Sequence, residues 1–75
     1  PGTVTAAQFY QTNNQLAASA QQLLQQGDVA WRNGNASEAR RLWGEAQVKG
    51  AATPVYNQAG ERLQRDLNNQ DPLGQ

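Results

Sequence analysis

The sequence contains no cysteine and no histidine, and these two absences exclude most kinds of site chemistry. Without cysteine no disulfide can form, and without either residue the usual protein ligands of zinc, haem iron and iron–sulfur clusters are missing. Catalytic pairs in which a histidine activates a serine or a cysteine are excluded too. We therefore expect neither a metal ion nor a cofactor.

An excess of charge of either sign is also lacking. Six basic and six acidic residues give a formal net charge of zero, so the chain has no field that would attract nucleic acid or an anionic membrane surface. No apolar run approaches the ~20 residues that cross a bilayer. We therefore expect no nucleic-acid partner and no membrane span.

The short length limits the chain to one small domain, over residues 1–75. A chain of this size buries roughly 60–65% of its unfolded surface when it folds alone. Without disulfides or metals, such domains depend on well-packed helices or on a partner chain. Glutamine, alanine and asparagine dominate the composition, which indicates helices with polar faces.

The first helix is predicted over residues 5–32. Thr5 and Gln8 have the spacing of a capping box at the helix start. Apolar and small residues then recur at steps of three, four and seven, which predicts two adjacent buried stripes. One stripe consists of Phe9, Leu16, Ala20, Leu23, Gly27 and Ala30, and the other of Tyr10, Ala17, Leu24 and Trp31. We favour one continuous helix over the alternative, a break at Asn13-Asn14.

A second helix is predicted over residues 36–49. Gly34 suits the left-handed position after a helix end, and Asn35 suits the next N-cap, with Glu38 placed to reach back to it. Gly50 suits the stop. Gly44 lies inside this helix, where its small size would allow another backbone to approach closely. The inner positions are Ala39, Leu42, Trp43 and Ala46.

A third helix is predicted over residues 54–67, because Thr53 suits the cap and Pro54 the first helical position. It ends near Asn68-Asn69, and residues 70–75 form a coil tail. Its expected buried stripe is Val55, Tyr56, Ala59, Leu63 and Leu67. No strand pattern is present and both connections are short, so we predict an all-α antiparallel three-helix arrangement.

The first two helices are expected to touch at Gly27 and Ala39. These residues have almost no side chain, so the helix axes can approach each other closely there. Leu42 and Trp43 would then project toward the third helix and fill the groove. Tyr56 is also assigned to helix packing.

The central hairpin resembles a tetratricopeptide repeat, a 34-residue helix–turn–helix unit with small residues at its helix contacts. Aligned on Gly27, the family pattern fits Ala30, Gly34, Ala39, Trp43, Ala46, Tyr56 and Gly60, within about residues 20–67. The chain departs from the pattern at Gln26, where leucine is usual, and at Ala51, where a proline is usual. A generic glycine–alanine hairpin is therefore the alternative. The resemblance implies binding of peptides or partner helices, without chemistry.

Most charged residues have an opposite charge three or four positions away, as on exposed helix surfaces. Such pairs include Asp28–Arg32, Glu38–Arg41, Arg41–Glu45, Glu61–Arg65 and Arg62–Asp66. Arg40 has no such neighbour and is the candidate for contact with an external acidic group. Because tryptophan and arginine are enriched at binding hot spots, Trp31, Arg32 and Arg40 form the candidate partner contact. Trp43 is assigned to the core, apart from this patch.

Catalysis is not indicated. The carboxylates lie on predicted helix surfaces, no apolar setting would raise their pKa, and the glycines form no phosphate-binding loop. We therefore expect a protein that is not an enzyme and favour a protein–protein interaction or scaffolding module, with a protein partner or a homo-oligomer. The alternative is a small structural subunit of a large assembly, such as a virion or secretion apparatus, ordered by its neighbours.

Overall fold

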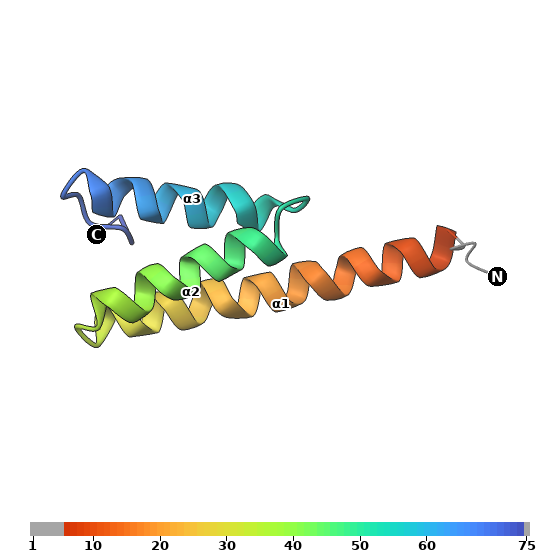
Figure 1. The fold of residues 1–75 in the computed structure, drawn as a ribbon, viewed down its shortest axis with the longest axis horizontal. Helices are drawn as coiled ribbons and strands as arrows, with labels where there is room; N and C mark the ends of the chain where they lie inside the picture. Colours follow the sequence, from red (N-terminus) through yellow and green to blue (C-terminus); the bar gives the residue numbers. More distant parts are fainter. Residues whose placement is uncertain (1–5, 75) are drawn as a thin grey trace.

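The computed structural model describes the backbone of residues 6–74 and the side chains of residues 14–74. Three helices follow one another: α1 (Ala6–Arg32), α2 (Ala36–Lys49) and α3 (Pro54–Leu67). Over the described backbone there is no strand (Figure 1). The predicted all-α fold and its antiparallel order are confirmed, and α1 continues through Asn13-Asn14 without a break. The capping box at Thr5 and Gln8, and the side chains of Phe9 and Tyr10, lie outside the described residues.

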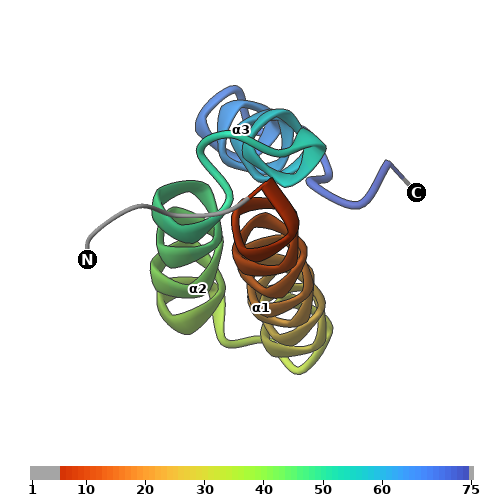
Figure 2. The same ribbon diagram turned by 90° about the vertical axis from the view of Figure 1, so that its right-hand side faces the viewer.

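The molecule is a short bundle with a long projection. α2 packs against both other helices, whereas α1 and α3 touch over a smaller area (Figure 2). The principal extents are 49 × 19 × 18 Å, and the radius of gyration is 14.2 Å. A compact chain of this length has a radius of gyration of about 11 Å. The difference arises because α1 has 27 residues and α2 only 14, so the N-terminal part of α1 extends beyond its neighbours.

The first turn uses Asn35 for two helices at once. Gly34 has φ +81°, its N–H donates to the Trp31 carbonyl at 3.0 Å, and the Asn35 N–H donates to the Ala30 carbonyl at 2.9 Å. These two bonds satisfy the last carbonyls of α1. The Asn35 side chain in turn accepts the Glu38 N–H at 3.2 Å and caps α2. The connection therefore needs only three residues, which holds the two helices side by side.

The predicted reciprocal half of this cap is wrong. Glu38 does not reach back to the Asn35 N–H, because that N–H is already bonded to α1 and the Glu38 carboxylate pairs with Arg41.

The third helix begins and ends as predicted. The Thr53 hydroxyl accepts the Val55 N–H at 3.2 Å and donates to the Gly50 carbonyl at 2.9 Å. At the other end, Asn69 has φ +58° and closes α3 in the left-handed conformation. The predicted coil tail then folds back onto the bundle, where Pro72 is buried and Leu73 packs against the core.

The core is built around Trp43, whose side chain is completely buried. A Cβ atom at Gly27 would lie 2.6 Å from Cδ1 and Nε1 of Trp43 and 3.3 Å from the Ala39 carbonyl oxygen. The indole therefore occupies the space left by the glycine, and the Cδ1–Nε1 edge of the ring faces α1. The other buried apolar residues are Ala20, Leu24, Ala39, Leu42, Ala46, Val55 and Ala59.

Three predicted core positions are exposed. Tyr56 and Leu67 on α3 are 46% and 75% exposed, so their predicted burial is wrong. α3 is covered on one side only, and its buried stripe is correspondingly narrow, with Val55 and Ala59 at its centre. Leu16 on α1 is 43% exposed because α2 ends opposite Ala20, one turn further along.

The glycines inside helices differ in what surrounds them. Apart from the adjacent residues and the nearby backbone of α2 itself, no atom lies within 4 Å of a Cβ placed at Gly44, so the expected close approach of another backbone is wrong within this chain. Replacing Gly27 or Gly44 by alanine gains helix propensity worth about 1 kcal/mol. At Gly27 the added methyl group also collides with Trp43, a kind of overpacking that costs about 1–3 kcal/mol.

We therefore expect Gly44→Ala to be more stable than the parent chain and more stable than Gly27→Ala by about 1–3 kcal/mol. Equilibrium urea unfolding followed by helical circular dichroism measures both values. Because the propensity gain is common to the two variants, equal stabilities would contradict the proposed contact between Gly27 and Trp43.

Candidate interaction surfaces

A largely covered ion pair joins α1 and α3. Arg62 of α3 donates from Nε to Oδ1 of Asp28 at 2.7 Å and from Nη2 to Oδ2 at 3.1 Å. The same carboxylate accepts the indole N–H of Trp43 at 3.0 Å. The side chains of Asp28 and Arg62 are only 13% and 24% exposed. Asp28 therefore connects all three helices.

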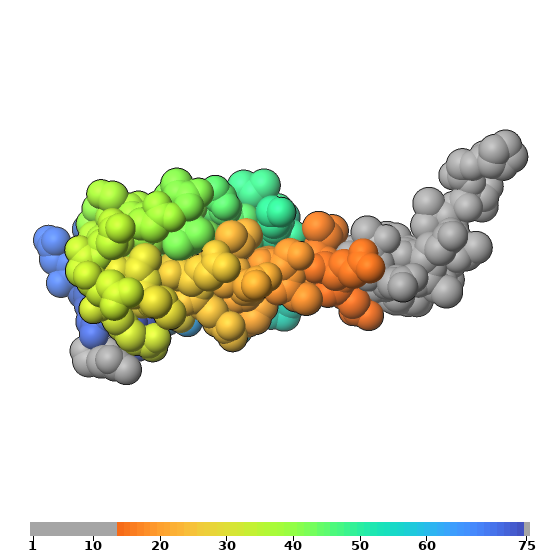
Figure 3. All heavy atoms as spheres, turned by 90° about the horizontal axis from the view of Figure 1, so that it is seen from below, coloured from red at the N-terminus to blue at the C-terminus, as the bar shows by residue number. Residues whose placement is uncertain are grey.

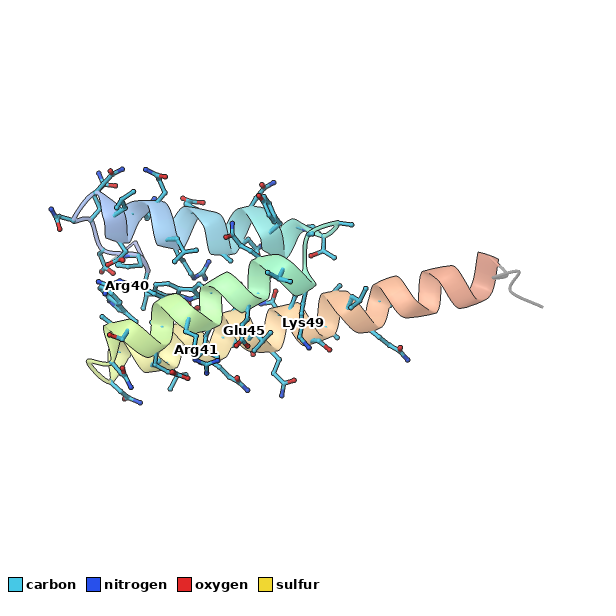
Figure 4. The ribbon with its side chains drawn as sticks, viewed as in Figure 1. Arg40, Arg41, Glu45 and Lys49 are labelled. Carbon is cyan, nitrogen blue, oxygen red and sulfur yellow. The ribbon has the colours of Figure 1, made fainter. Side chains whose placement is uncertain are left out.

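A second ion pair joins α2 to α3. Arg40 donates from Nε to Oδ2 of Asp66 at 2.6 Å and from Nη2 to Oδ1 at 3.1 Å. Arg40 points toward the C-terminal end of α3, whereas Arg41 and Glu45 lie on the side of α2 away from α3 (Figure 4). Hydrogen bonds from Arg40 lower the pKa of the Asp66 carboxyl.

These two pairs overturn three predictions. Arg40 is bonded to Asp66, so its guanidinium group is not free to bind an acidic group of a partner. The predicted Asp28–Arg32 and Arg62–Asp66 pairs do not form, because each carboxylate bonds to an arginine of another helix. Packing brings these partners together from distant positions in the sequence.

The other local pairs are confirmed. Arg41 bonds to Glu38 and to Glu45 on the exposed side of α2, and the bond to Arg41 lowers the pKa of Glu38. On α3, Arg65 Nη2 lies 3.2 Å from Glu61 Oε1. All these side chains are well exposed, so each pair contributes little to stability.

An open groove of about 450 Å³ lies where the first turn meets the end of α3. It contains two of the three predicted contact residues, Trp31 and Arg40, whereas Arg32 is exposed outside its lining. The remaining lining residues are Asp66, Asn69, Gln70 and Asp71. Trp31 is half-buried and stacks on Trp43, with ring centroids 5.9 Å apart and planes tilted by 33°. The expected separation of the two tryptophans is therefore wrong.

A second candidate surface lies at the opposite end, on the part of α1 that extends beyond α2. The sequence has no charged side chain before Asp28, so this whole part of the helix is uncharged. Among its described side chains, Leu16 is 43% exposed and Ala17 is half-buried. On the face shown in Figure 3, the orange part of α1 extends beyond the green surface of α2. Sequence reasoning missed this surface, although the position of the first charge was visible.

Three further features of the described residues limit the kinds of site that they form. Within residues 14–74, no group of three or more acidic side chains is placed to hold a metal ion. Every buried side-chain nitrogen and oxygen in that range has a hydrogen-bond partner. Over the described residues, none of the helices is both long and apolar enough to span a membrane.

Comparison with models of protein families, with curated proteins and with solved structures gave no match.

The covered ion pair is expected to matter more than an exposed one. Asp28→Asn leaves Arg62 without a charged partner and is expected to cost about 1.5–3 kcal/mol of unfolding free energy, the range for hydrogen bonds to charged groups. Glu61→Gln, which removes an exposed pair on the same helix, is the control and should cost at most about 0.5 kcal/mol. Similar losses in urea unfolding of the two variants would argue against a structural role for Asp28.

The pair at Asp66 predicts a dependence of stability on pH. Its carboxyl has a pKa below the ordinary 3.8 in the folded protein, so the unfolded chain takes up the proton first as the pH falls. The stabilising contribution is complete well above that ordinary value and is lost as the pH falls through the lower, folded pKa. In urea unfolding, the stability advantage over Asp66→Asn should shrink below about pH 4. An advantage that stays constant down to about pH 2 would refute this account.

Proposed function

We propose that the chain is a non-enzymatic protein–protein interaction module that docks through the projecting part of α1, residues 6–19. The observation that carries this proposal is an exposed apolar side chain on the uncharged part of α1 that extends past α2: Leu16 is 43% exposed, one turn before the fully buried Ala20. The rest of the molecule, from Ala20 to the tail, packs on itself and holds this helix in place.

The composition of the projection supports the proposal. The cores of protein interfaces are depleted in charged residues, since each buried charge must be desolvated. Isolated short helices are also marginally stable in water, and most helical stability in proteins comes from packing of an apolar face. A helix without ion pairs and without a covering neighbour therefore gains most from a partner.

The resemblance to tetratricopeptide repeats points the same way. Gly27 and Ala39 are both buried where α1 and α2 approach closely, which is the arrangement that the resemblance implies for this hairpin. Units of that family bind peptides or partner helices and perform no chemistry. This likeness supports an interaction function.

A structural subunit of a larger assembly is the second candidate. It is favoured by the position of the groove at Trp31, which lies at the opposite end of the molecule from the projection. Two surfaces at opposite ends would let one chain contact two neighbours.

Site-specific photo-crosslinking in the producing cells tests the proposal. Leu16 is replaced by p-benzoylphenylalanine in one variant, and Val48, which is 80% exposed on α2, is replaced in the control. We expect a discrete crosslinked protein at position 16 that is absent at position 48. The same pattern at both positions, or no product at position 16, would rule out docking through α1.

A further inference from the structure

We propose that the partner of the projecting helix is a second copy of this chain, bound with its own α1 antiparallel to the first. This inference rests on the proposed function, in which residues 6–19 of α1 are the docking surface. It names the occupant of that surface.

The part of α1 that is packed against α2 ends at Ala20. A Cβ at Gly50 would lie 2.9 Å from the Ala20 Cβ, so the C-terminal end of α2 meets α1 at Ala20. Residues 6–19 of α1 therefore extend past α2, over about 21 Å at 1.5 Å per residue. Leu16 and Ala17 precede Ala20 by four and three positions, so they continue the buried stripe onto the uncovered part of the same face.

The absence of charge on the projection favours an uncharged binding partner. All six acidic and all six basic side chains lie from Asp28 to Asp71, so nothing on the projection can neutralise a charged partner. A charged partner surface would have to lose its hydration without gaining an ion pair. The same projection of another copy is uncharged as well, and the two surfaces meet without desolvated charge and without repulsion.

α2 runs antiparallel to α1 and stops at Gly50, so a second α1 antiparallel to the first runs in the direction of α2 and begins where α2 ends. This places the positive end of the partner's helix dipole at the negative end of α2. A twofold axis through the projection gives both copies the same contacts, as in most closed dimers.

The small size of the interface determines the affinity expected of such a dimer. Two projections of about 21 Å form an interface smaller than the standard size of stable complexes. We therefore expect a dissociation constant in the micromolar range, about 1–100 µM.

Sedimentation equilibrium of the purified 75-residue chain tests the inference, from about 5 µM to about 1 mM. We expect the mass to rise from 8.2 kDa toward twice that value. Leu16→Glu places a charge on each side of the twofold interface and should weaken association roughly 100-fold. Val48→Glu is the matched control, because it makes the same change at an apolar residue exposed on α2, and it should dimerise like the parent.

Two further measurements separate a lost interface from a lost fold. Ala17→Glu charges the same face at a neighbouring position and should also abolish the dimer, and both variants should keep the buried tryptophan fluorescence of the parent.

Because the interface contains no ion pair, the dissociation constant should not increase between about 0.05 M and about 1 M salt.

A parent chain that is monomeric throughout, a dimer unaffected by Leu16→Glu and Ala17→Glu, or a dimer dissolved by salt would each overturn the inference. These failures differ from failure of the proposed function. A monomeric chain that still crosslinks through position 16 to another protein loses only the second copy as partner, whereas absence of any product at position 16 removes the docking surface itself.

Discussion

The contact between Trp43 and Gly27 is the constraint on which the rest of the structure depends. A fully buried indole requires a partner for its N–H, and Asp28, the residue next to the glycine, provides it at 3.0 Å. A carboxylate held at this depth in turn requires a positive charge, and Arg62 of α3 supplies it. One missing side chain on α1 thus determines the packing of α2 and the position of α3.

The helices could be predicted because their signals are local. Asn35, Gly34, Thr53 and Pro54 each act on backbone groups within a few positions, so the printed sequence contains all that is needed to place the helix ends. The closeness of α1 and α2 was also predictable at Gly27, since a glycine inside a helix is costly unless something occupies its space. The same argument was wrong at Gly44, where nothing does.

The charge pairs between helices and part of the surface could not be predicted, because they depend on which helices become neighbours. Spacing along one helix favours the pair Asp28–Arg32, but such exposed pairs contribute only a few tenths of a kcal/mol. Asp28 instead pairs with the largely covered Arg62 of α3. Arg40 has no local partner and finds Asp66 across the bundle, which brings it beside Trp31 in the groove and leaves Arg32 outside. The burial expected for Tyr56 was wrong for the same reason, since it required knowing how many sides of α3 are covered.

The confinement of charge to one part of the chain gives the molecule a chemical polarity along its length. The packed bundle carries every aspartate, glutamate, lysine and arginine, and the projecting part of α1 carries only amides, hydroxyls and apolar groups. The molecule therefore consists of a bundle with equal numbers of positive and negative side chains and a projecting helix without any. Lowering the pH therefore changes the net charge of the bundle and its migration in an electric field, whereas the projecting part of α1 gains no charge.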